Sequence, residues 1–233
     1  KSLSDFDNKS GKQVLNRWMS DETAKASAEI TEAITGYRFN DAANAAYRFV
    51  WNIYCDWYLE LAKPLLTGAD EAAKAETRAM VAWARDEILK LLHPFMPFIT
   101  EELWGVTSPS VIPGRAEGAN PESRANASER VPVDSGSGAA RRPAMTGENL
   151  LALASWPGVK FTDDKAEAEI GWVIDLVTAV RSVRAEINIT AQIPLVLAGA
   201  SAETKGRAER WAEFIQRLAR VSDISSADAA PAG

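Results

Sequence analysis

Apolar residues recur at steps of three and four from about Lys12 to Trp104, and this periodicity constrains the fold more than any other feature of the sequence. Alanine, leucine and glutamate dominate the stretch, and runs of β-branched residues are few, so local preferences favour helix as well. Glycine and proline residues divide the stretch into long helices joined by short loops. This pattern predicts an antiparallel helix bundle.

Four helices are predicted in this stretch, over residues 13–35, 40–63, 69–92 and 98–104. Gly36 marks the end of the first helix, because glycine is common just past a helix C-terminus. Asn40 is expected to cap the second helix, which should end around Lys63 and Pro64.

The composition changes between residues 107 and 149, where Pro, Gly, Ser, Ala and Arg replace large apolar side chains. Such a segment buries too little apolar surface to offset its ordering entropy, so we expect a disordered insertion. A helix over 165–187, a strand over 193–198, a helix over 202–219 and a strand over 221–224 should follow. The predicted fold class is mainly α, an antiparallel bundle with a small C-terminal α/β appendage. Its predicted parts are the bundle (1–106), the insertion (107–149), a return to the bundle (150–164) and a small helical or α/β module (165–233).

Few residues of this chain can carry catalysis or hold a metal ion. Cys55 is the only cysteine and His93 the only histidine among 233 residues. The single cysteine excludes an internal disulfide and a cysteine-based zinc site, and a lone histidine just before Pro94 favours a structural role over a metal site or a Ser-His-Asp set. No glycine-rich phosphate loop follows a strand. We therefore expect no catalytic residue, no metal ligand and no cofactor in this chain.

Charge and hydropathy limit the kinds of partner. The net charge of −6 argues against a simple nucleic-acid binder, so a nucleic-acid role must rest on local basic surfaces. No apolar run is long enough to span a membrane, and the first residues lack the apolar core of a signal peptide. We expect a cytoplasmic protein without a membrane partner. Because the first residue is not Met, we also expect a fragment or a processed product.

The predicted helix over 40–63 carries three kinds of side chain on neighbouring faces. Its predicted core face consists of Phe39, Ala42, Ala43, Ala46, Val50, Ile53, Trp57 and Leu61. An aromatic face lies beside it: Tyr47, Trp51, Tyr54 and Tyr58. A polar ridge follows: Arg48, Asn52, Asp56 and Lys63. Rings beside Arg and Asn suit unpaired RNA bases, which stack on aromatic groups. Residue types alone favour the alternative, in which the rings pack on neighbouring helices and the ridge is solvated.

Two arginines interrupt the apolar face of the predicted helix over 165–187. Arg181 and Arg184 share an arc with Val173, Ile174 and Val177 on a helical wheel. Because burying an unpaired arginine is costly, these side chains should have partners. They either pair with carboxylates of the bundle or emerge at its end and meet phosphates, and the sequence leaves both open.

Several phrases of the sequence resemble the anticodon-binding region of valyl-tRNA synthetases. They are YRFNDAA over 37–43, CDWYLELAKP over 55–64, LHPFMPFITEELW over 92–104, and VRSVRAEIN over 180–188 followed by IPL over 193–195. The third phrase is also similar to leucyl and isoleucyl enzymes, whereas CDWYLE is more particular to the valine enzyme. The insertion over 107–149 departs from the family pattern.

The resemblance implies a helix bundle that binds valine tRNA, within an enzyme that uses ATP to join valine to that tRNA. The catalytic signatures and the editing domain of such an enzyme are absent from this sequence, so the chain alone is expected to be inactive, and we expect a monomer. The candidate tRNA contacts are Arg17, Arg38, Trp51, Asn52, Asp56 and Lys63, with Arg181 and Arg184. Arg and Lys would hold phosphates, while Asn and Asp would read base edges. The alternatives are a helical protein–protein interaction module, or the equivalent region of an isoleucyl or leucyl synthetase.

Overall fold

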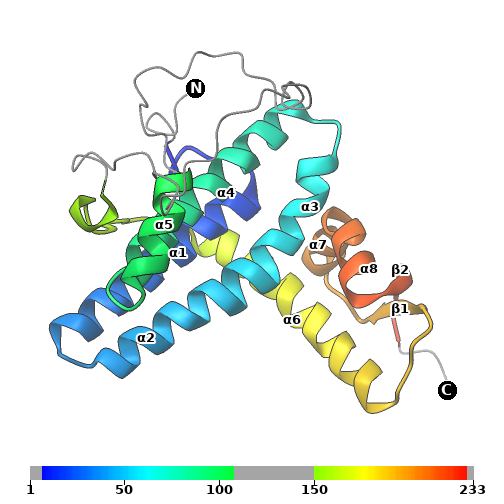
Figure 1. Ribbon diagram of the computed structural model, residues 1–233. Helices are drawn as coiled ribbons and strands as arrows, with labels where there is room; N and C mark the ends of the chain where they lie inside the picture. The colour runs from blue at the N-terminus through cyan, green and yellow to red at the C-terminus, as the bar shows by residue number, and fades with distance from the viewer. Residues whose placement is uncertain (1–6, 108–149, 230–233) are drawn as a thin grey trace, which may run out of the picture.

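The computed structural model describes residues 7–107 and 150–229 (Figure 1). The first of these two stretches is helical throughout, as predicted, and its long helices lie against one another in antiparallel fashion. In chain order its elements are α1 (Val14–Thr35), α2 (Phe39–Arg48), η2 (Phe49–Tyr58), α3 (Leu59–Thr67), α4 (Glu71–Leu92) and α5 (Pro97–Thr107). Of the predicted insertion over 107–149, Thr107 is the last residue of α5, and residues 108–149 lie outside the described residues.

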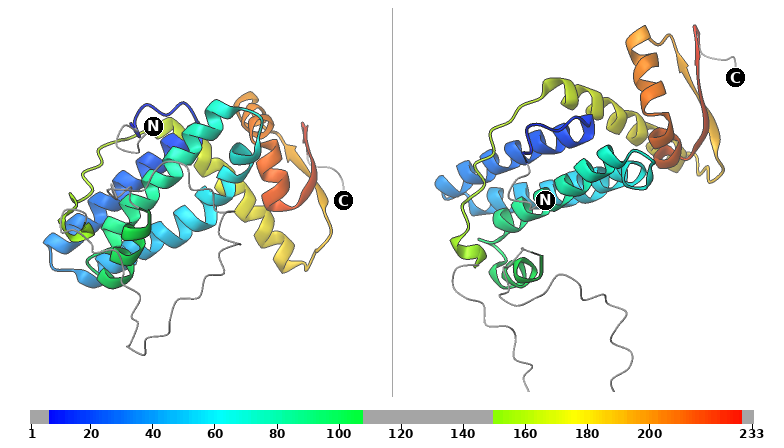
Figure 2. Two further views of the ribbon diagram at one scale, coloured as in Figure 1. Left: turned by 45° about the horizontal axis from the view of Figure 1, so that its top comes forward. Right: turned by 90° about the horizontal axis from the view of Figure 1, so that it is seen from above.

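The second stretch begins with a short turn on the bundle and ends in a small α/β module (Figure 2). Its elements are η5 (Leu151–Leu153), α6 (Asp164–Glu186), β1 (Ile193–Ala198), α7 (Ala202–Arg210), α8 (Ala212–Ala219) and β2 (Val221–Ala227). The two strands pair in parallel, and α7 with α8 forms the crossover between them. The predicted class, mainly α with a small C-terminal α/β appendage, is confirmed.

Several helix ends follow from local chemistry. Gly36 ends α1, as predicted. Two backbone N–H groups ahead of α1, those of Lys12 and Gln13, donate to the carboxylate of Glu76 in α4, at 3.0 and 2.9 Å. Asp70 caps α4 through the N–H groups of its first turn. Asn40, by contrast, makes no cap: α2 already begins at Phe39, so the predicted role of Asn40 is wrong.

The predicted helix over 40–63 is one continuous rod made of three elements, and it ends later than expected. Its middle, η2, has i→i+5 hydrogen bonds, and the N–H of Leu59 donates to the carbonyl of Tyr54. The rod continues past Pro64 to Thr67, so the predicted end at Lys63 and Pro64 is wrong. A proline leaves the carbonyl four residues earlier without its helical donor. Here that carbonyl, on Glu60, accepts a hydrogen bond from Arg217 of α8.

Smaller corrections concern element boundaries. The predicted helix over 202–219 is interrupted at Trp211, which separates α7 from α8. Pro97 does not precede α5 but is its first residue, a position where the missing N–H costs little. Strand β2 extends to Ala227 rather than ending at Ile224.

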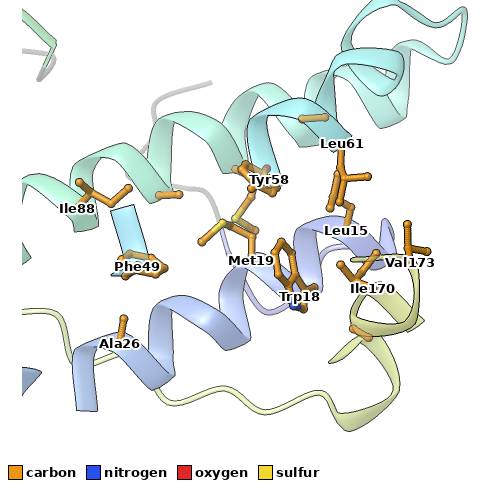
Figure 3. Packing of buried hydrophobic residues seen from close by; sticks show 14 of the residues in the cluster. Leu15, Trp18, Met19, Ala26, Phe49, Tyr58, Leu61, Ile88, Ile170 and Val173 are labelled. Carbon is orange, nitrogen blue, oxygen red and sulfur yellow. The ribbon is translucent and has the colours of Figure 1, made fainter. Parts of the chain in front are cut away.

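Helix α1 lies at the centre of the core, because it packs against α2, α4 and α6. Figure 3 shows its side chains Leu15, Trp18 and Met19 among residues of the rod and of α6. The core cluster continues through α6 to Phe214 and Ile215 of α8. Among the described residues, no helix has both the length and the apolar character needed to cross a membrane.

Candidate functional site

Two aromatic rings stand exposed on the α2 and η2 parts of the rod. Tyr47 and Trp51 are 61% and 55% exposed, although large rings are usually buried. One helical turn apart, they stack with 6.3 Å between ring centroids and 7° between ring planes. The pair therefore presents a flat apolar surface to solvent, with a geometry that suits stacking of a further planar group.

The other two rings of the predicted aromatic face turn inward. Tyr58 is fully buried, and its hydroxyl donates to Oδ1 of Asn16 at 3.0 Å. The hydroxyl of Tyr54 donates to the carbonyl of Val81 at 3.3 Å, and burial raises the pKa of Tyr54 to about 12. The physical reason is η2: each i→i+5 turn holds more residues than an α turn, so the aromatic line winds around the rod. The predicted face is thus half surface and half core.

The polar ridge lies on the surface along its whole length. Arg48, Asn52, Asp56 and Lys63 are all exposed. The guanidinium of Arg48 pairs with Glu29 of α1 at 2.5 Å, and the ammonium of Lys63 pairs with Glu60 at 2.5 Å. Exposed pairs of this kind contribute about 0–1 kcal/mol each, so their cations can exchange partners at little cost.

Arg48 and Asn52 also line a hollow between α1 and the rod, with Glu22, Lys25 and Glu29 on the other side. Lys25 is surrounded by carboxylates, at 3.1 Å from Asp21, 3.1 Å from Glu22 and 2.6 Å from Glu167. Although burial works in the opposite direction, these hydrogen bonds raise the pKa of Lys25. The cation is therefore held in place by α1 and α6.

A second aromatic group stands at the turn between α1 and α2. Tyr37 and Phe39 meet edge to face, with 6.3 Å between centroids and 84° between planes, and both are exposed. Between them in sequence, Arg38 pairs with Glu32 at 3.1 Å and with Asp41 at 3.2 Å. The assignment of Phe39 to the core is therefore wrong, because the periodic pattern does not register that the residue lies at the exposed start of its helix. The sequence held one indication that Phe39 is exposed, namely its position directly after the charged Arg38.

Arg17 has a structural partner away from this surface. Its guanidinium forms an ion pair with Asp163, which is buried and accepts from the N–H of Ala166 at the start of α6. Arg17 is itself only half-buried. The pair ties α1 to the first turn of α6.

Arg181 and Arg184 meet backbone oxygens, which neither predicted alternative described. Nε of Arg181 donates to the carbonyl of Leu218 at 2.9 Å, and Nη1 of Arg184 donates to that of Arg220 at 3.3 Å. These carbonyls lie at the C-terminal end of α8, where helical donors are missing. Arg181 also lies over the ring of Trp57, 5.5 Å from its centroid. Arg184 is buried, which leaves it no surface for a phosphate.

The described residues offer no group of three or more His, Cys, Asp or Glu side chains placed to hold a metal ion. Nδ1 of His93 lies 2.8 Å from the hydroxyl of Thr100, a contact that joins α4 to α5. The exposed rings, arginines and amides of the rod and of the α1–α2 turn form the candidate site. Their chemistry is that of stacking, phosphate pairing and base-edge hydrogen bonding.

Comparison with known proteins gives consistent matches. Residues 16–198 match the family described as the anticodon-binding domain of tRNA ligase. The valine–tRNA ligase of Rhodopseudomonas palustris is 61% identical over 98% of this chain and 24% of its own length. Those of Nitrobacter winogradskyi and Bradyrhizobium diazoefficiens are each 56% identical over 98% of this chain, and over 23% and 24% of their own lengths. The chain thus spans about a quarter of the curated relatives it matches, in their C-terminal region.

Proposed function

The chain belongs to the family of anticodon-binding domains of tRNA ligases, and from this premise we propose that it binds the anticodon loop of a valine tRNA within a valine–tRNA ligase. In that ligase, other parts of the polypeptide would use ATP to activate valine and would transfer it to the tRNA. The relatives that carry this name are 45–61% identical to the chain, which supports the choice of valine.

The exposed ring pair Tyr47–Trp51, flanked by Arg48 and Asn52, is the observation that carries the proposal. Unpaired anticodon bases can stack on such rings, and an Asn amide can bond to base edges. The rings have no comparable structural role, because exposed aromatic groups contribute little to the core. Asp56 of η2 and Lys63 of α3 extend the same ridge.

Phosphate contacts would come from cations that can leave their present partners. Arg38 and Arg48 are exposed and hold exposed carboxylates, so a phosphate can replace those carboxylates at small cost. Because Glu29, Glu32 and Asp41 accompany these two arginines, binding would require phosphates to displace carboxylates that carry as much charge as the cations supply. We leave Arg17, Arg181 and Arg184 out of the contact set, because Arg17 pairs with a buried carboxylate and the other two bond backbone carbonyls, whereas Arg38 and Arg48 pair with exposed carboxylates.

We also propose a division of labour along the chain. Residues 1–106 with 150–164 would hold the anticodon stem and loop, while the module over 165–233 would support the bundle. The insertion over 107–149 would take no part. We further propose that the protein acts as a monomer in the cytoplasm.

The test is tRNA binding by the chain at two salt concentrations. A valine tRNA should bind more tightly than the same tRNA with a changed anticodon, and its affinity should fall as salt rises. Trp51→Ala should weaken binding about tenfold, since stacking contributes about 1–3 kcal/mol per base. Phe98→Ala, which removes an exposed ring from α5, is the matched control and should leave binding unchanged.

Equal affinity for both anticodons, or no effect of salt, would contradict the proposal and favour a protein–protein interaction module. Tighter binding of an isoleucine or leucine tRNA would instead reassign the specificity. Arg38→Gln should weaken binding to all tRNAs alike. It should also reduce the slope of log affinity against log salt concentration by about one, which corresponds to one ion released.

A further inference from the structure

Helix α5 presents an apolar stripe to solvent. Met96, Ile99, Leu103 and Val106 follow one another at steps of three, four and three, so they share one face. Their exposed fractions are 50%, 48%, 44% and 77%. Phe98, 92% exposed, lies beside them. Figure 1 places α5 at the edge of the bundle.

A flank of α5 next to this stripe faces the protein, through polar residues and the partly buried Trp104. Thr100 is 1% exposed and is within hydrogen-bond distance of His93, and Glu101 accepts from the N–H of Leu151 at 2.9 Å. A surface helix normally buries its apolar stripe and exposes its polar face. Because the apolar stripe of α5 is exposed instead, it has the character of an interface that another surface covers.

The charges of α5 narrow the choice of partner. Residues 97–107 include two glutamates and no lysine or arginine, so the helix has nothing to offer phosphates of RNA or the anionic surface of a membrane. The sequence over 108–149 is also poorly suited to cover the stripe, because its large apolar residues are few and scattered. An apolar protein surface with a neutral or basic rim fits best.

We propose that this face of α5 docks against another domain of the valine–tRNA ligase in which the chain acts. The relatives are about four times as long as the chain, so such a ligase holds ample further protein surface. Docking there would fix the position of the anticodon-binding bundle relative to the rest of the enzyme. The proposal rests on the proposed function in one respect, namely that the chain works within the longer ligase.

Accessibility of Leu103 tests the docking. The probe is a maleimide applied to Leu103→Cys in a Cys55→Ser background, in the chain alone and in a chimera where the chain replaces the matching region of the Rhodopseudomonas palustris ligase. Labelling should be about tenfold slower in the chimera, because access then requires local opening. Glu209→Cys, on the exposed surface of α7, is the control and should react equally in both proteins.

A second measurement tests the same contact through stability instead of labelling. Leu103→Glu should leave the melting temperature of the chain unchanged but should lower that of the chimera. Equal labelling rates of Leu103→Cys in the chain and in the chimera would overturn the proposal. So would a chimera whose melting temperature is the same with and without Leu103→Glu. Association of the chain with itself that Leu103→Glu abolishes would assign the face to a second copy instead. None of these results depends on tRNA, whereas the proposed function stands or falls on tRNA binding by the chain alone.

Discussion

At the scale of single residues, the buried polar groups near the start of α1 form one connected network. Asn16 is fully buried, and its amide donates to Glu76 at 2.9 Å and to the hydroxyl of Thr77 at 3.2 Å. Its carbonyl oxygen accepts from Tyr58. A buried polar atom without a partner is costly, so each member of the network depends on the others.

We predict that Tyr58→Phe lowers the free energy of unfolding by about 1–3 kcal/mol, because it leaves Oδ1 of Asn16 buried without a donor. Urea unfolding measures the change. The matched control is Tyr47→Phe, whose hydroxyl lies on an exposed ring and should be dispensable. Equal effects of the two substitutions would contradict the role given to the network.

At the scale of elements, side chains of the C-terminal module complete backbones that the bundle leaves unsatisfied. The carbonyl of Glu60, freed by Pro64, accepts from Arg217 of α8. Within the module, Arg181 and Arg184 of α6 donate to carbonyls at the end of α8. The bond from Arg217 to Glu60 explains why a proline is tolerated inside α3.

This arrangement predicts coupling between Pro64 and Arg217. Arg217→Met should lower the free energy of unfolding more in the natural chain than in a Pro64→Ala background, where an alanine N–H can satisfy Glu60. The interaction energy from the double-mutant cycle should be about 0.5–1 kcal/mol. Strictly additive effects in urea unfolding would show that Arg217 does not compensate for the proline.

A carboxylate of α6 joins that helix to α7 and to Trp211, and it makes stability depend on pH. Glu169 accepts from Arg207 at 3.0 Å, from Arg210 at 2.8 Å and from the indole of Trp211 at 3.0 Å. Although burial works in the opposite direction, the hydrogen bonds from Arg210 and Trp211 lower the pKa of Glu169. A lowered pKa means that the stabilisation is present above the ordinary glutamate pKa and is lost as pH falls below it.

We therefore predict that Glu169→Gln costs stability at pH 7, and that the difference from the natural chain persists down to the ordinary glutamate pKa of about 4.3 and shrinks as pH falls below it. Urea unfolding at pH 7 and at about pH 3, below that pKa, measures this. Glu209→Gln, a change on the exposed surface of α7, is the control and should behave like the natural chain at both. A constant difference between the natural chain and Glu169→Gln would rule out the proposed linkage.

At the scale of the whole molecule, one core cluster connects the bundle to the module. Val173 and Val177 of α6 belong to it. So do Trp211, just before α8, and Phe214 of α8, whose rings lie 4.9 Å apart. Helix α6 packs against α1 as well as α8, as its course in Figures 1 and 2 shows. A continuous core favours cooperative unfolding.

Phe214→Ala should accordingly destabilise the whole chain, by about 3–5 kcal/mol for a buried aromatic ring. The loss should be the same when unfolding is followed by far-ultraviolet circular dichroism, which is dominated by the bundle helices, and by hydrogen exchange of α1. A stable α1 beside an unfolded module would show instead that the two parts unfold separately.

The sequence by itself determined the helices, the two strands and the family. These depend on local preference, on the spacing of apolar residues and on continuous phrases such as residues 55–64, all of which the chain carries without its fold. It also marked the polar ridge of Arg48, Asn52, Asp56 and Lys63, which the structure places on the surface.

Only the tertiary structure decided which residues of each helix face are buried and which group each charged side chain contacts. Tyr58 is core while Trp51 is surface, because η2 shifts the phase of the rod and α1 and α4 cover only part of it. Arg184 bonds a carbonyl that lies 36 residues away in sequence. Periodicity reports which residues share a face, but burial and pairing depend on what packs there, and that is a property of distant segments brought together.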